Sequence, residues 1–231
     1  LILIKQQHEK ISTLFIFALS ASLFLVSCKQ SAEKKQNTPN NLEVKKGEKP
    51  APLVVLNANL ATESDLIALG LSSELVTKLL AARPFLTMAD FNVNVAEENT
   101  EELFKKLFVP FNLNTTAEKD FKMIPGVGDK MAHEFEEYRP YTSVLQFKRE
   151  IGKYVDENEV ARYLDYVFVP VELNTATEND IKALPGVGDK MTHEFLEYRP
   201  YKNLAQFRKE IGKYVDDKEL SRLERFVYLK E

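Results

Sequence analysis

Two short stretches of the chain share residue types that are suited to binding an anion. Residues 124–130 read Ile-Pro-Gly-Val-Gly-Asp-Lys, and residues 184–190 read Leu-Pro-Gly-Val-Gly-Asp-Lys. Proline and two glycines favour a tight turn that needs positive φ or close backbone approach. Asp129 and Asp189 are expected to cap the helices that follow. The outward-facing N–H groups of such a turn and helix N-terminus can bind an anion, most obviously a phosphate.

Helical patterns around the second stretch predict the elements that position it. Thr175 with Glu178 has the spacing of a capping box, as has Thr115 with Glu118. Pro200 is expected to end the helix after the turn, because proline restricts the residue before it. Apolar residues at helical spacing predict four short helices, each with one buried face: Ile181 and Leu184; Val187, Met191, Phe195 and Tyr198; Leu204, Phe207 and Ile211; Leu220, Leu223 and Phe226.

These patterns belong to a long internal repeat. Residues 113–169 align with 173–229 without a gap, and more than half of the positions are identical. A divergent third copy lies upstream, where Arg83-Pro84-Phe85 parallels Arg199-Pro200-Tyr201. The expected fold is all-α, with three repeats at residues 53–110, 111–170 and 171–231, the first of them degenerate. Residues 108–111 and 168–171 are short and apolar, so neighbouring repeats are expected to pack against each other.

The first 52 residues have the pattern of an export signal and a tether. Basic residues precede an apolar run from Ile11 to Val26, which indicates a secretory signal over residues 1–27. The run ends Leu25-Val26-Ser27-Cys28, which resembles a bacterial lipobox and makes Cys28 the expected lipidation site; an uncleaved transmembrane anchor is the alternative. Residues 28–52 are polar and predicted to be a disordered tether. Its lysines either contact anionic lipid or keep the tether soluble. We therefore expect an exported protein, lipid-anchored to a bacterial membrane on its periplasmic or cell-surface side.

Composition limits the possible functions. The chain has one cysteine, so no intramolecular disulfide can form, and its net charge is −4. Residues 51–231 carry 23 Lys and Arg against 31 Asp and Glu. A strong nonspecific DNA-binding protein is normally basic. This acidity is the main observation against nucleic-acid binding.

The glycine stretches, with Leu-Asn-Thr-Ala-Thr before one of them and Glu-Tyr-Arg after each, resemble the tandem helix-hairpin-helix domains of competence DNA receptors (ComEA-like proteins). The resemblance is good over residues 112–230 and weak over 56–110. It implies sequence-independent binding of double-stranded DNA, in which hairpin amides and a lysine grip phosphates. By position it implicates eight residues: Gly126, Val127, Gly128, Lys130, Gly186, Val187, Gly188 and Lys190.

The chain departs from the family pattern at two places. The second hairpin of each unit keeps a single glycine, Gly152 or Gly212, and the first repeat reads Leu-Gly-Leu-Ser-Ser-Glu over residues 69–74. The first repeat is therefore expected to be a scaffold or cap. Further cations could support DNA binding or belong to a solvated helix face: Lys148, Arg149, Lys153, Arg208, Lys209 and Lys213.

Two functions from different classes remain open after this comparison. One is weak, nonspecific DNA binding; the other is an interaction scaffold that binds another envelope protein and no longer binds DNA. No enzyme activity, cofactor or metal is expected. Asp156 and Asp216 are interpreted as helix caps, and His133 and His193 as surface residues without neighbouring ligands.

Overall fold

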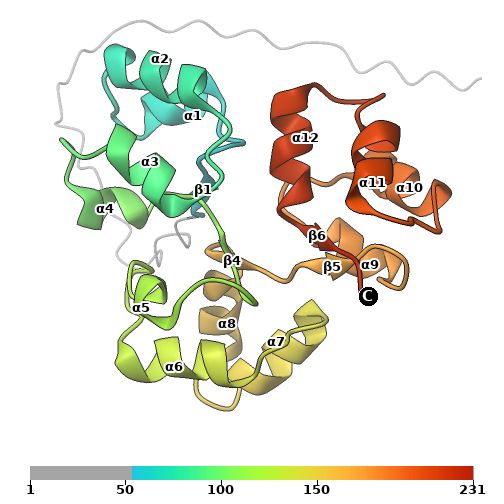
Figure 1. Cartoon of the computed structure of the whole chain (residues 1–231). Coiled ribbons are helices and arrows are strands. Elements are labelled where there is room, and N and C mark those ends of the chain that lie inside the picture. Colours follow the sequence, from blue (N-terminus) through green and yellow to red (C-terminus); the bar gives the residue numbers. More distant parts are fainter. Residues whose placement is uncertain (1–53, 231) are drawn as a thin grey trace, which may run out of the picture. The chain divides into compact units, whose positions relative to one another are not determined.

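The computed structural model describes residues 54–230, which belong to one compact unit (Figure 1). The signal over residues 1–27, the tether over 28–52 and Cys28 lie outside the described residues. Within the described part, the chain is helix-rich, with twelve short helices and six two-residue strands. No helix among these residues has the length and apolar character needed to cross a membrane.

The elements repeat three times in the order strand, four helices, strand. Repeat 1 contains β1 (Leu56–Asn57), α1 (Glu63–Ala68), α2 (Ser73–Ala82), α3 (Met88–Asn94), α4 (Thr100–Phe104) and β2 (Leu107–Phe108). Repeat 2 contains β3 (Phe111–Asn112), α5 (Glu118–Phe121), α6 (Asp129–Glu137), α7 (Val144–Ile151), α8 (Glu157–Tyr163) and β4 (Val167–Phe168). Repeat 3 contains β5 (Val171–Glu172), α9 (Glu178–Lys182), α10 (Asp189–Glu197), α11 (Leu204–Ile211), α12 (Asp217–Glu224) and β6 (Val227–Tyr228).

Each repeat is closed by a short parallel strand pair, which the helical pattern of the sequence did not indicate. The first strand of a repeat pairs with its last: β1 with β2, β3 with β4, and β5 with β6. In repeat 2, Phe111 lies opposite Val167. The apolar segments between repeats therefore contain the last strand of one repeat and the first strand of the next.

A half-buried asparagine joins the two halves of each repeat. The side-chain amide of Asn114 donates to the carbonyl of Tyr141 at 2.8 Å, and its oxygen accepts from the Tyr141 amide at 2.7 Å. Asn174 bonds Tyr201 in the same way, and Asn59 bonds Phe85. A side chain that satisfies both backbone groups of a distant residue fixes the loop before the first helix against the loop after the second.

The arginine before each proline has a structural role as well. Arg83 donates to the carbonyls of Ala58 and Ala61, both at 2.7 Å. Arg139 donates to the carbonyls of Leu113 and Thr116 in repeat 2. Desolvation lowers the pKa of both arginines, because burial disfavours the charged form. The Arg in the Glu-Tyr-Arg motif therefore holds the repeat together.

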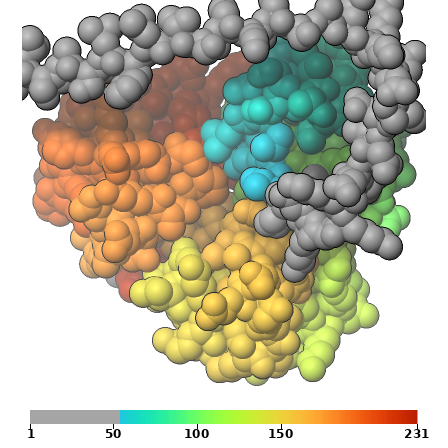
Figure 2. All heavy atoms as spheres, turned by 180° about the vertical axis from the view of Figure 1, so that it is seen from behind, coloured from blue at the N-terminus to red at the C-terminus, as the bar shows by residue number. Residues whose placement is uncertain are grey.

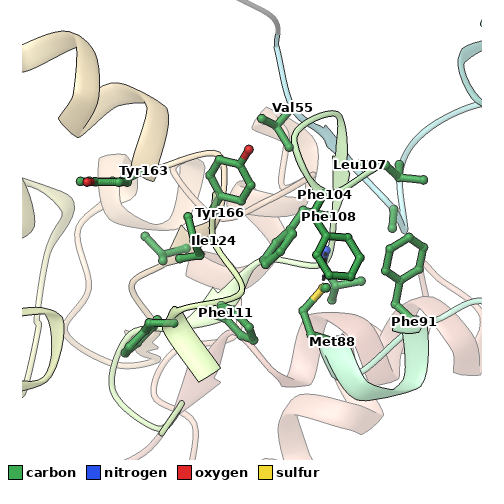
Figure 3. Close-up of a cluster of buried hydrophobic side chains, with 14 of the residues drawn as sticks. Val55, Met88, Phe91, Phe104, Leu107, Phe108, Phe111, Ile124, Tyr163 and Tyr166 are labelled. Atoms are coloured by element: carbon green, nitrogen blue, oxygen red, sulfur yellow. Dashed lines mark hydrogen bonds between the residues drawn. The ribbon is translucent and has the colours of Figure 1, made fainter. Parts of the chain in front are cut away.

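Repeats 1 and 2 share one hydrophobic core. The Phe108 ring, at the end of repeat 1, is fully buried and packs edge-on against Phe111 and Tyr166 of repeat 2, with ring centroids 5.2 and 4.9 Å apart. Figure 3 shows this group of rings, and in Figure 2 the segment around β1 (cyan) lies against repeat 2. Repeats 2 and 3 meet at Phe168 of β4, which belongs to the cluster of repeat 3 and packs edge-on against Phe226, with ring centroids 4.7 Å apart. Neighbouring repeats therefore pack against each other, as expected.

Several helix ends differ from the sequence expectation. Thr177, not Thr175, caps α9, and its hydroxyl accepts from the Asp180 amide at 3.2 Å. Thr175 instead donates to Glu172 at 2.6 Å, which keeps it in the turn before the helix. Ala117 precedes α5 without a side-chain cap, so the Thr115 box is absent as well.

The expected buried faces are largely present. Phe195, Phe207 and Ile211 of repeat 3 are fully buried, whereas Leu204, expected on the inner face of α11, is 37% exposed. Leu204 is the first residue of α11, so its side chain can point to solvent without leaving a cavity in the core. Asp156 and Asp216 cap α8 and α12, as expected, by accepting from the amides three residues on.

Candidate functional site

The glycine turn of repeat 2 is built by two buried apolar residues and one glycine in a left-handed conformation. The Ile124 amide donates to the carbonyl of Phe121, and the Val127 amide donates to the carbonyl of Ile124 at 3.0 Å. Both side chains are buried, which anchors the turn in the core. Gly126 between them has φ of 82°, and its counterpart Gly186 has φ of 73°. Only glycine adopts this conformation without a steric cost.

Four of the eight expected site residues build the turn itself: Gly126, Val127, Gly186 and Val187. The amides of Val127 and Val187 are already bonded to the carbonyls of Ile124 and Leu184. Because these two amides already have acceptors, the amides that are left open lie later in the turn, at Gly128 and Gly188 and beyond. Gly126 and Gly186 are exposed and shape the turn.

The N-terminus of α6 is open. Gly128 stands at the cap position in an extended conformation, and having no side chain it leaves the first amides of the helix without a side-chain partner. Among residues 54–230, no acceptor is hydrogen-bonded to the amides of Gly128, Asp129 or Lys130. Gly188 leaves α10 open in the same way. The expectation that Asp129 and Asp189 are the caps is corrected: each is the first residue of its helix.

Charges around the open N-terminus are partly balanced. Asp129 forms an exposed ion pair with Lys122, and this pair lowers the pKa of the Asp129 carboxyl. In repeat 3, Lys182 pairs with Asp189 at 3.0 Å. Lys130 and Lys190 are exposed, and neither forms an ion pair with any residue between 54 and 230. Each open helix end therefore has one uncommitted lysine beside it.

The equivalent turn of repeat 1 is closed. Gly70 keeps the left-handed conformation with φ of 87°, but Ser72 occupies the cap position. Its hydroxyl accepts from the Leu75 amide at 3.2 Å, so a side chain uses a donor that is free in the other repeats. Glu74 stands four residues after the turn glycine, where repeats 2 and 3 have lysine. Repeat 1 lacks both the open amides and the cation.

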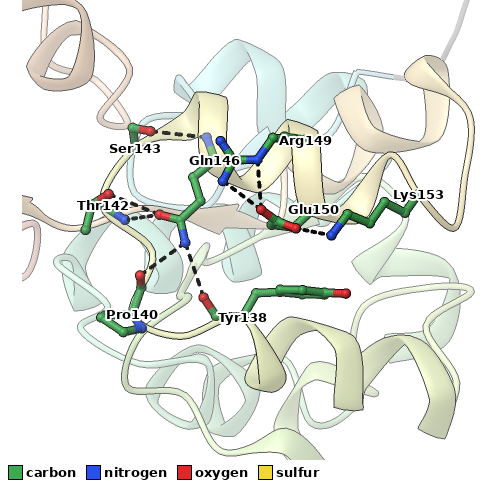
Figure 4. Close-up of polar contacts among 8 residues, drawn as sticks. All are labelled: Tyr138, Pro140, Thr142, Ser143, Gln146, Arg149, Glu150 and Lys153. Atoms are coloured by element: carbon green, nitrogen blue, oxygen red, sulfur yellow. Dashed lines mark hydrogen bonds and ion pairs between the residues drawn. The ribbon is translucent and has the colours of Figure 1, made fainter.

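Most of the other candidate cations have acidic partners. Glu150 pairs with Arg149 at 2.7 Å and also with Lys153, as Figure 4 shows. In repeat 3, Arg208 pairs with Glu224, while Lys209 and Lys213 pair with Glu210. Lys148 is the one candidate of the six without an ion pair in the described part of the chain. These cations thus belong mainly to a mixed-charge surface.

The single glycine in the second turn of repeats 2 and 3 has a structural explanation. Gly152 has an ordinary helical φ of −61°, but a Cβ atom there would lie 2.6 Å from the Lys148 carbonyl oxygen. Gly212 has the same close contact with Arg208. These glycines are required by close packing, and they form no second left-handed turn.

His133 and His193 lie on the surface. His133 is near Glu118 and Glu137, at 3.4 and 3.9 Å, and His193 is 3.4 Å from Glu197. Among the described residues there is no group of three or more His, Cys, Asp or Glu side chains placed to hold a metal ion.

Comparisons of the sequence and structure with known proteins add no family. No protein-family model, curated protein or solved structure matches this chain significantly.

Proposed function

We propose that the three repeats are helix-hairpin-helix units of the competence DNA receptor (ComEA-like) type, and that they bind DNA without sequence preference and without catalysing a reaction. The observation that carries this proposal is the difference between the repeats. Repeats 2 and 3 leave a helix N-terminus open beside an unpaired lysine, whereas repeat 1 closes the same position with Ser72. A turn that only needed to be stable would gain from a serine cap everywhere.

The geometry supports phosphate as the ligand. A phosphate oxygen can accept from the amides of Gly128, Asp129 and Lys130, where the helix dipole also favours negative charge. The Lys130 side chain adds a charge-assisted bond, and Lys122 offsets the charge of Asp129. None of these groups reads a base edge, so binding fixes position without sequence preference.

A salt series tests the proposal with duplex DNA and the fragment 51–231, which contains the compact unit described above. Two turns with about two phosphate contacts each predict a slope of log affinity against log salt of about −3 to −4, at roughly −0.9 per contact. Binding should be weak, because the acidic body repels the polyanion. Lys130→Glu with Lys190→Glu should abolish it on every sequence.

A second pair of variants separates loss of the site from loss of the fold. Gly128→Ser with Gly188→Ser should give repeats 2 and 3 the serine cap of repeat 1. The stability of the fragment should stay the same or rise by a few tenths of a kcal/mol, because Ser is a slightly better cap than Gly. DNA binding should fall, because the serine side chain, bonded to the Met131 amide as Ser72 is bonded to the Leu75 amide, would stand over the open helix end where the phosphate must approach. Undiminished binding by this stable variant would contradict the proposed site.

The proposal places these repeats on an exported lipoprotein. Its support is the Leu-Val-Ser-Cys sequence at residues 25–28, after an apolar run. In this reading, lipid on Cys28 holds the protein at the membrane surface and the repeats meet DNA outside the cytoplasm, on the periplasmic or cell-surface side.

A protein-interaction scaffold is the second candidate, and the ion pairs favour it. Five of the six additional cations are paired with glutamates, and repeat 1 replaces the site lysine with Glu74. With most of these cations neutralised and acidic residues in excess over residues 51–231, the repeats suit a basic partner in the envelope. No retention of DNA by the wild-type fragment at low salt would leave the scaffold as the better function.

A further inference from the structure

Repeats 2 and 3 each present one exposed aromatic ring that the proposed phosphate site does not use. Tyr154 is 37% exposed and Tyr214, at the same position of the next repeat, is 39% exposed. Most other aromatic rings of the described residues lie in the cores. A large ring left on the surface twice at one position needs an explanation in terms of either stability or binding.

A hydrogen bond holds each exposed ring in place. The Tyr154 hydroxyl lies 2.7 Å from the Tyr138 hydroxyl, and the matching distance between Tyr214 and Tyr198 is 2.8 Å. The partner tyrosine is itself covered, because the Lys153 amine lies 4.7 Å from the Tyr138 ring centroid (Figure 4). Lys213 covers Tyr198 at 4.8 Å. A lysine thus fixes the inner ring, and the inner ring orients the outer one.

In repeat 2 the outer ring lies beside the open helix end. The amine of Lys130, the uncommitted cation of the turn, is 5.8 Å from the Tyr154 ring centroid. Lys130, Tyr154, Tyr138 and Lys153 therefore form a continuous strip from the N-terminus of α6 to the turn after α7. Repeat 1 has no such strip: Ala82 stands in the place of Tyr138, directly before the Arg-Pro pair, and residues 96–98 between α3 and α4 are Ala-Glu-Glu.

Many proteins bind single-stranded nucleic acid on a surface that combines cations with exposed aromatic rings. The cations follow the phosphates, and the ring stacks on a base whatever its identity. In a duplex the bases already stack on each other, so the ring gains nothing there. We propose that Tyr154 and Tyr214 each stack on an unpaired base, so that the protein binds single-stranded DNA in preference to duplex. This inference rests on the proposed function and specifies the form of DNA that it takes.

Tyrosine fluorescence gives a direct test, because the chain contains no tryptophan. The fragment 51–231 is titrated with a deoxythymidine oligonucleotide and, separately, with a hairpin duplex containing the same number of phosphates. We expect tighter binding of the single strand, together with quenching of the tyrosine emission.

The variant Tyr154→Leu with Tyr214→Leu removes both rings and keeps every lysine. Affinity for the single strand should fall by about tenfold for each ring, whereas affinity for the duplex should change by less than about twofold. The salt slope should stay the same, because the number of phosphate contacts is unchanged. The matched control, Tyr154→Phe with Tyr214→Phe, keeps the rings and should keep most of the preference for the single strand.

The outcomes separate this inference from the proposed function. Equal loss of single-strand and duplex binding in the Leu variant would show that the tyrosines only support the fold, and would overturn the inference. A wild-type preference for duplex, or unchanged single-strand binding in the Leu variant, would overturn it as well while DNA binding itself stands. Binding of neither form at low salt would overturn the proposed function and this inference together.

Discussion

At the scale of single residues, the two glycines of each turn have different tasks. Gly126 is in the left-handed region with φ of 82°, and a Cβ atom there would lie 3.4 Å from the guanidinium of Arg162. Gly128 is extended, and a Cβ atom there would meet nothing within 4 Å. The first glycine shapes the turn, and the second leaves the helix end uncovered.

This difference can be measured by alanine substitution. Gly126→Ala should lower the free energy of unfolding by about 1 kcal/mol, because an L-residue is strained at positive φ. Gly186→Ala should cost more, because its Cβ would also lie 2.9 Å from Leu60 and 3.0 Å from Arg222. Gly128→Ser, which keeps a favourable cap residue, is the control and should leave stability nearly unchanged. Similar losses in all three variants, measured by thermal unfolding, would contradict this assignment.

Thr192 is a buried polar residue. It is 1% exposed, and its hydroxyl forms no hydrogen bond with any residue between 54 and 230. Repeat 2 has Ala132 at this position. Thr192→Ala should therefore raise the free energy of unfolding by about 1 kcal/mol, because an unsatisfied buried hydroxyl is costly. The reverse change, Ala132→Thr, should destabilise repeat 2 in the same denaturation experiment; a neutral effect in both would contradict the argument.

At the scale of elements, an ion pair within α8 makes the stability of the fold depend on pH. Glu159 accepts two hydrogen bonds from Arg162, at 2.8 and 2.6 Å, and these lower the pKa of its carboxyl. A lowered folded-state pKa means that the pair contributes stability above the ordinary glutamate pKa of about 4.3. This contribution is lost as the pH falls through the lower, folded-state value.

The expected result is a loss of stability in acid that depends on this pair. The melting temperature of the wild-type fragment should fall between pH 5 and pH 3, and part of that fall should be missing in Glu159→Gln. The difference should correspond to less than about 1 kcal/mol, because the pair is partly exposed to solvent. Parallel melting curves for the two proteins across this range would show that the pair does not contribute.

At the scale of the whole molecule, the shared core makes repeats 1 and 2 depend on each other. Phe108 packs against rings from both repeats. Phe108→Ala should lower the free energy of unfolding by about 3–5 kcal/mol, the usual cost of emptying a buried phenylalanine site. Hydrogen exchange should then increase in α4 and in α5 together. Increased exchange in repeat 1 alone would show that the two cores are independent.

In the proposed function, attachment of the molecule to a membrane depends on Cys28. If the lipobox assignment is correct, Cys28→Ser should stop incorporation of fatty acid and leave the signal uncleaved by lipoprotein signal peptidase. Metabolic labelling and the mass of the mature protein measure both effects. Normal labelling of the variant would contradict the assignment.

The sequence alone determined the features that depend on residues close together in the chain. The 60-residue repeat, the buried faces of the helices, the left-handed turn at Gly126 and the caps at Asp156 and Asp216 all follow from local spacing and backbone preference. The loss of the turn lysine from repeat 1 was readable in the same way. Turn chemistry is local because a glycine or a cap acts within four residues of itself.

The bond of the Val127 amide to the Ile124 carbonyl and the cap at Gly128 rather than Asp129 are also local, although the residue pattern alone did not predict them. Only the tertiary structure decided which distant segments meet. The strand pairs join segments more than 50 residues apart, and the Tyr138–Tyr154 bond spans 16. Partners at such separations are set by where the helices pack, and no local pattern of residues carries that information.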